Sequence, residues 1–123
     1  MIKWSIDNDR NYIDTLYSGE ITIQQVLDYH ASIETAFPHQ SSIRIYNDIR
    51  KCNFNFDMHD IPQFVASIQK AVRNYERVRS VYLTDDPKIS AIMSVYEIKV
   101  IGIEHYHIQH FSTEKAARAW LEP

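Results

Sequence analysis

Three histidines stand close together near the end of the chain, at His105, His107 and His110. Neutral imidazoles are common zinc ligands, and an H-x-H pair on one strand face can supply two of them. Because side chains alternate along a strand, His105 and His107 share a face while His110 points to the other. A catalytic zinc site needs a third ligand. We therefore favour a solvated or edge strand, and keep a metal-dependent hydrolase built on His105 and His107 as the least favoured alternative.

Carboxylates gather at the ends of two predicted strands. Asp48 and Arg50 fall at the end of one, and Asp85 and Asp86 follow the next. Open α/β sheets place binding sites beyond the carboxyl ends of their strands, and grouped carboxylates can hold magnesium. A structural interpretation is favoured over a metal site here. In it, Asp86 caps a helix, and Asp48 pairs with Arg50 or caps the loop backbone.

The segment that follows Arg50 combines a cysteine with several apolar residues in a predicted loop. Cys52 would be a nucleophile only if a histidine such as His59 activated it, and a partly buried, inert thiol is the favoured interpretation. Phe54, Phe56 and Met58 either cover the sheet end or present an apolar surface to a partner or ligand. Core packing is somewhat favoured, yet this is where a functional surface is expected. The candidate binding residues are Asp48, Arg50, Phe54, Phe56, Asp57 and Tyr96.

Composition excludes several classes of protein. The net charge of −3 provides no concentrated basic surface for nucleic acid. Glycine occurs only at positions 19 and 102, so neither a dinucleotide-binding fingerprint nor a phosphate-binding loop can be written. No cofactor is therefore expected.

The 123 residues indicate one domain spanning residues 1–123, with 45% apolar and 24% charged residues. No uncharged run approaches the ~18 apolar residues of a membrane span, and the N-terminus lacks the apolar core of a signal peptide. Cys52 is the single cysteine, which rules out an intrachain disulfide and predicts a cytoplasmic protein.

The elements that must position these residues follow from the apolar period, which switches repeatedly between about 2 and about 3.6. Thr22 and Gln25 form a capping box, and Asp86-Pro87 is a strong helix start. Ser112 or Thr113 would cap a last helix. The expected elements are a hairpin of 2–6 and 12–16, a helix from 22 to 37, a strand 43–49, a loop 51–57, a helix from Asp57 or Asp60 to 75, a strand 78–83, a helix from 87 toward 102, the histidine strand, and a final helix with Ala116, Ala117, Trp120 and Leu121 facing inward.

This order, β-β-α-β-α-β-α-β-α, predicts an α/β fold. The sheet is expected to be mixed and largely parallel, with helices packed on it and the N-terminal β-hairpin at one edge.

Four pieces of the chain, in order from Tyr17 to Leu121, resemble the SpoIIAA-like or STAS-like family of small, mostly bacterial proteins. They are Ser18-Gly19-Glu20-Ile21-Thr22 before the first helix; Ile45-Tyr46-Asn47-Asp48-Ile49-Arg50 at a strand end; Val81-Tyr82-Leu83-Thr84-Asp85-Asp86-Pro87 with Met93-Ser94-Val95-Tyr96-Glu97; and Phe111, Ala117, Trp120 and Leu121 at the close. The family is related in fold to anti-sigma-factor antagonists and CRAL-TRIO lipid-transfer domains.

The resemblance implies a STAS-like domain without enzymatic activity. In anti-sigma antagonists a serine at the start of the helix after the second core strand is phosphorylated. This chain has no serine or threonine from Asn53 to Val65, so no phosphorylation site is assigned.

Three hypotheses follow from the residues and the resemblance together. The favoured one is a regulatory module that binds an unknown protein partner, a second copy of itself included, around Asp48 to Asp60. The second is a binder of a small apolar or lipid-like ligand beside Phe54, Phe56 and Tyr96. The third is the hydrolase on His105 and His107.

Overall fold

The computed structural model describes residues 1–122 and contains the predicted succession of strands and helices. In chain order the elements are β1 (Ile2–Asp7), β2 (Tyr12–Ile21), α1 (Ile23–Glu34), β3 (Ser42–Phe54), a 3₁₀ helix (Met58–Asp60), α2 (Ile61–Val72), β4 (Arg77–Leu83), α3 (Pro87–Lys99), β5 (Tyr106–Phe111) and α4 (Glu114–Leu121).

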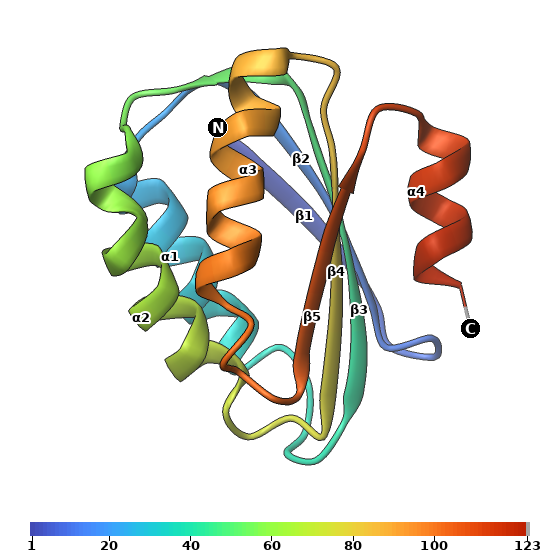
Figure 1. Cartoon of the computed structure of the whole chain (residues 1–123). Coiled ribbons are helices and arrows are strands. Elements are labelled where there is room, and N and C mark those ends of the chain that lie inside the picture. The colour runs from blue at the N-terminus through green and yellow to red at the C-terminus, as the bar shows by residue number, and fades with distance from the viewer. Residues whose placement is uncertain (123) are drawn as a thin grey trace.

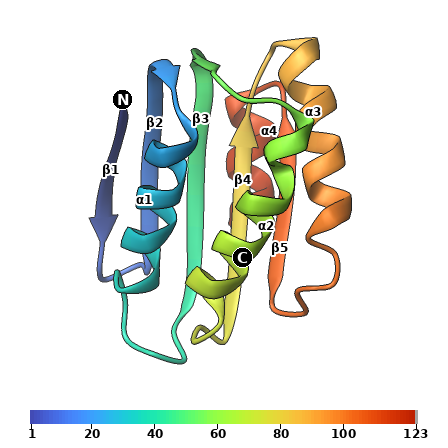
Figure 2. The same ribbon diagram turned by 90° about the vertical axis from the view of Figure 1, so that its left-hand side faces the viewer.

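The strands form one mixed sheet in the order β1-β2-β3-β4-β5. β1 and β2 make the expected antiparallel hairpin at one edge, while β2 to β5 run parallel. Because parallel neighbours need right-handed crossovers and the strand order never reverses, α1, α2 and α3 all lie on the same face (Figures 1 and 2). α4 returns to the opposite face and covers it alone (Figure 1).

β3 is longer than the sequence predicted, and part of the expected loop belongs to it. Its pairing with β2 shifts by one residue, because Leu16 faces Asp48 while Ser18 faces Lys51. This extra residue is a β-bulge, so Ile49 and Cys52 both reach the main core although they are three positions apart. Alternation breaks at the bulge, which is why the period alone ended the strand at Ile49.

The helix starts agree with the cap signals. Thr22 and Gln25 form the capping box before α1. The side chains of Asp86 and Thr113 accept hydrogen bonds from backbone N–H groups in the first turns of α3 and α4. Both predicted starts before α2 are used, since Asp57 caps the 3₁₀ helix and Asp60 precedes α2. α1 ends at Glu34, three residues before the predicted Phe37.

The apolar residues form two cores, one on each face of the sheet. The larger core lies under α1, α2 and α3, and the smaller one lies under α4. In α4, Ala117 and Leu121 are buried in the smaller core, as expected. Trp120 is partly buried and packs against that core, and Ala116 is also partly buried. Among residues 1–122 no helix combines the length and the apolar character needed to cross a membrane.

Candidate functional site

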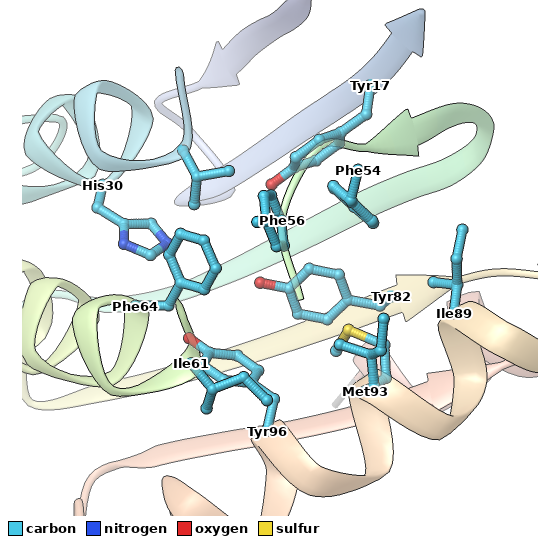
Figure 3. Close-up of a pocket in the computed structure, with 12 residues that line it drawn as sticks. Tyr17, His30, Phe54, Phe56, Ile61, Phe64, Tyr82, Ile89, Met93 and Tyr96 are labelled. Carbon is cyan, nitrogen blue, oxygen red and sulfur yellow. The ribbon is translucent and has the colours of Figure 1, made fainter. Parts of the chain in front are cut away.

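A pocket lies on the face of the sheet that α1, α2 and α3 cover, near the carboxyl ends of β3 and β4. Its volume is about 60 Å³, less than half of the ~150 Å³ that holds a benzene ring in a protein core. Six of its lining residues are aromatic: Tyr17, Phe54, Phe56, Phe64, Tyr82 and Tyr96. The others are Val26, His30, Ile61, Ile89, Ile92 and Met93 (Figure 3).

Aromatic rings in contact form one side of this pocket. Phe56 lies with its ring centroid 4.8 Å from that of Phe54 and 4.6 Å from that of Phe64. Tyr17 meets Phe54 edge to face at 6.3 Å. Phe54 closes β3, so the bulge in β3 places its ring on the face covered by α1, α2 and α3. Phe56 follows the strand and packs between Phe54 and Phe64. The aromatics of the predicted loop therefore face inward as pocket wall.

The polar groups of the pocket differ in how well they are paired. The Tyr17 hydroxyl donates to Oδ1 of Asn47 at 3.3 Å, and Nδ2 of Asn47 donates to Oγ of Ser80 at 3.0 Å. The Tyr96 hydroxyl is buried and has no hydrogen-bond partner among residues 1–122. Burial raises the pKa of both tyrosines well above its usual value, so both hydroxyls stay protonated.

His30 contributes an uncharged imidazole to the pocket. The side chain is buried in α1, and its Nδ1 lies 2.9 Å from Oγ of Ser67 in α2. Burial lowers the pKa of His30 to about 4, because the imidazolium ion would lose its hydration. No side chain of Asp, Glu, Lys or Arg within residues 1–122 lines the pocket. Its interior is therefore neutral at physiological pH.

Asp48 and Arg50 lie apart from this pocket. Along β3 the side chain of Asn47 turns toward the helices, so that of Asp48 turns to the α4 face. Arg50 donates to both carboxylate oxygens of Asp48, at 3.1 and 2.9 Å. Partial burial tends to raise the pKa of Asp48, but the hydrogen bonds from Arg50 outweigh it and the pKa is lowered. The two residues satisfy each other, as the structural interpretation expected.

Asp57 and its neighbours form the outer side of the same segment. Oδ1 of Asp57 accepts hydrogen bonds from the backbone N–H of His59 and from its ring, at 2.8 and 3.2 Å. Met58 is 50% exposed. Of the six candidate residues, three therefore meet at the pocket, Asp57 caps the segment beside it, and Asp48 and Arg50 form a separate pair.

Cys52, His105 and His110 make their hydrogen-bond contacts outside the pocket, and His107 is exposed. Burial raises the pKa of Cys52 to about 11, and its thiol donates to the carbonyl of Ile49. Nε2 of His105 lies 2.7 Å from the carbonyl oxygen of Val72, and Nδ1 of His110 lies 2.6 Å from Glu97 in α3. Within residues 1–122 no three His, Cys, Asp or Glu side chains are grouped as metal ligands.

Comparison with known proteins identifies the family of this chain. Residues 12–122 match the family model described as SpoIIAA-like. The chain belongs to the SpoIIAA-like family. No curated protein matches it.

Two solved structures share the SpoIIAA-like fold. An uncharacterized protein of the DUF3478 family from Shewanella loihica PV-4 is 14% identical over 98% of this chain and 94% of its own, with a TM-score of 0.64. The Bacillus cell-fate determinant SpoIIAA, in its phosphorylated form, is 17% identical over 99% of this chain and 100% of its own, with a TM-score of 0.53. At these identities the likeness establishes the fold alone.

Sequence reasoning missed most of the pocket of this SpoIIAA-like protein. Tyr17 and Tyr82 stand in strands and His30 stands in a helical stripe, where each looks like an ordinary core residue. One signal was available, because a tyrosine or histidine on a buried face must place its polar atom somewhere. That signal identifies the individual residues, but it does not predict that they lie close together in one pocket.

Proposed function

We propose that this SpoIIAA-like protein is a non-enzymatic regulatory module that binds a protein partner through the segment between β3 and α2. Support for the absence of catalysis comes from the groups able to do chemistry. The thiol of Cys52 is protonated, His105 is bound to a backbone carbonyl, and Asp48 is paired with Arg50. A buried, unpaired cysteine also supports a reducing, cytosolic location.

The observation that carries the proposal is the exposure of Met58. Its side chain is half exposed between two exposed polar residues, Asp57 and His59, on the segment that also lines the pocket. Methionine is enriched at protein interfaces, where an apolar centre is surrounded by a polar rim. A second copy of this chain is one partner that such a surface would accept.

The test is affinity capture from extracts of the source cells with three baits, namely the wild type, Met58→Asp and Ile101→Asp. Ile101 is a matched control, because it is an even more exposed apolar residue, at 75%, beyond the far end of α3. We expect the partner to be recovered with wild type and Ile101→Asp and lost with Met58→Asp. Sedimentation of the same three proteins tests self-association. Identical recovery and identical sedimentation with all three baits would contradict the proposal.

A second function, binding of a small apolar ligand, is favoured by the pocket. Phe54, Phe56 and Tyr96 line it together, as that hypothesis required. The volume of about 60 Å³ limits the ligand to a few non-hydrogen atoms unless the wall moves. This size supports a small molecule over a lipid chain.

A further inference from the structure

The strand β1 forms an open edge of the sheet. It pairs with β2 alone, and Figure 2 shows it at the left-hand margin with no described part of the chain beyond it. Met1 and Ser18 exchange two backbone hydrogen bonds, at 2.6 and 2.9 Å. Because bonded and non-bonded pairs alternate in an antiparallel ladder, the backbone N–H and C=O groups of Ile2, Trp4 and Ile6 point away from β2. They form a row of hydrogen-bonding groups along the edge.

The side chains beside this row leave an apolar surface uncovered. Met1 is 56% exposed and Trp4 is 41% exposed. The ring of Trp4 lies 6.4 Å from that of Tyr29 in α1, centroid to centroid, and both residues line a hollow of about 260 Å³. An open strand edge next to apolar side chains is a template for pairing with another strand. The β1 edge therefore has the features of a strand-pairing interface.

The opposite edge of the sheet, formed by β5, is less suited to such pairing. The carbonyl of His105 accepts from Val78 in β4, so by alternation the backbone groups of Tyr106 face outward. The N–H of Tyr106 already donates to the carbonyl of Ile103, at 3.1 Å. The row on β5 is therefore partly occupied at its start.

A second copy of β1 complements this edge. When two copies run antiparallel with Trp4 opposite Trp4, Ile2 of each lies opposite Ile6 of the other, so all of their outward groups are paired. Lys3 and Asp7 are exposed and share the other face of the strand. The same register brings Lys3 of one copy diagonally opposite Asp7 of the other, within reach of a long side chain. A register centred on Lys3 would instead place two ammonium groups against each other.

We propose that this protein forms a symmetric dimer in which the β1 strands of two copies pair antiparallel and join the two sheets into one. The pairing covers the exposed indole of Trp4 and the hollow beside it. The interface uses the edge of the sheet and not the segment between β3 and α2. The inference therefore goes beyond the proposed function and does not depend on it.

The first measurement combines sedimentation equilibrium of the wild type with amide hydrogen exchange on the same samples over a dilution series. We expect a dimer whose population falls on dilution. The amides of Trp4 and Ile6 should be protected in the dimer and should exchange quickly in the monomer. The amides of Lys3 and Ser5 face β2 and should stay protected at every concentration, which makes them an internal control.

Two variants of Trp4 test the backbone pairing. Trp4→Val and Trp4→Pro both remove the indole, but only proline also removes the outward N–H at the centre of the proposed pair. We expect Trp4→Val to keep a weakened dimer and Trp4→Pro to sediment as a monomer at the same concentration. Far-UV circular dichroism and thermal unfolding verify that both variants are folded.

A charge reversal tests the register. Lys3→Glu should raise the dissociation constant of the dimer about tenfold, because the two-fold symmetry makes each attraction lost and each repulsion gained occur twice. Lys115→Glu is the matched control, since it makes the same change of charge at an exposed residue of α4. It should leave the dissociation constant as it is.

Two results would overturn the inference. One is a wild type that sediments as a monomer at its highest soluble concentration. The other is a dimer in which the amides of Trp4 and Ile6 exchange as quickly as in the monomer, because another surface then joins the copies. Met58→Asp should sediment like the wild type, so the capture experiment on Met58 still decides the protein-contact function separately.

Discussion

At the scale of single residues, the interior of this protein contains several buried hydroxyl and amide groups. The Tyr17, Asn47 and Ser80 side chains form a hydrogen-bonded series inside the main core. The hydroxyls of Tyr96 and Tyr106 are buried there without a partner among residues 1–122. Paired and unpaired hydroxyls therefore coexist in one environment. Removing a paired hydroxyl should lower stability, and removing an unpaired one should not.

The stability of three Tyr→Phe variants tests this difference. Tyr17→Phe removes the donor to Asn47 and leaves a buried carbonyl oxygen unpaired, so the free energy of unfolding should fall by about 1–2 kcal/mol. Tyr96→Phe and Tyr106→Phe remove no hydrogen bond within the described chain and should leave stability unchanged or slightly raised. Urea denaturation measures all three. A loss with Tyr96→Phe as large as with Tyr17→Phe would contradict this prediction and show that the Tyr96 hydroxyl is hydrogen-bonded in solution.

The buried imidazole of His30 predicts a pH dependence of stability. Its pKa is about 4 in the folded protein and about 6.5 in the unfolded chain. Between these values the unfolded chain binds more protons, so stability falls as the pH decreases below 6.5. The expected loss is about 1.6 kcal/mol between pH 6.5 and pH 5, measured by urea denaturation. His30→Gln should flatten the curve in this window, and an unchanged slope would show that other groups cause it.

At the scale of elements, the β-bulge in β3 and the placement of α4 shape the molecule most. The bulge keeps Cys52 and Phe54 on the face covered by α1, α2 and α3, which lets the end of β3 form the pocket wall. α4 alone covers the other face, where the guanidinium group of Arg118 lies 3.7 Å from the centre of the Tyr46 ring and Arg79 lies 4.4 Å from that of Trp120. One face is thus sealed by three helices and the other by a single short one.

Truncations within α4 should rank by burial and not by size. Leu121 is 1% exposed, so Leu121→Ala should lower the free energy of unfolding by about 3 kcal/mol. Trp120 is half-buried and packs at the helix edge against Phe111 and Arg79. Trp120→Ala should therefore cost less than Leu121→Ala, even though it removes the larger side chain. Thermal and urea unfolding of the pair measure this, and a larger loss at Trp120 would mean that the indole carries the docking of α4.

At the scale of the whole molecule, the two candidate functions meet at the carboxyl-terminal edge of the sheet. The segment after β3 presents Met58 outward and Phe56 inward, toward the pocket. This edge is where parallel α/β sheets usually bind their ligands. Both proposals can therefore be tested on one small region of the molecule.

By itself, the sequence determined the order of elements, the helix starts, the hairpin at the edge and the family. These follow from local physics, namely apolar period, caps such as Thr22 and Asp86, and turn residues, each of which acts within a few positions of the chain. Only the tertiary structure decided the rest. The bulge depends on the pairing of β3 with β2, the partial burial of Trp120 depends on where α4 crosses the sheet, and the pocket joins residues as distant as Tyr17 and Tyr96. Such contacts are set by the packing of whole elements, and no local pattern records them.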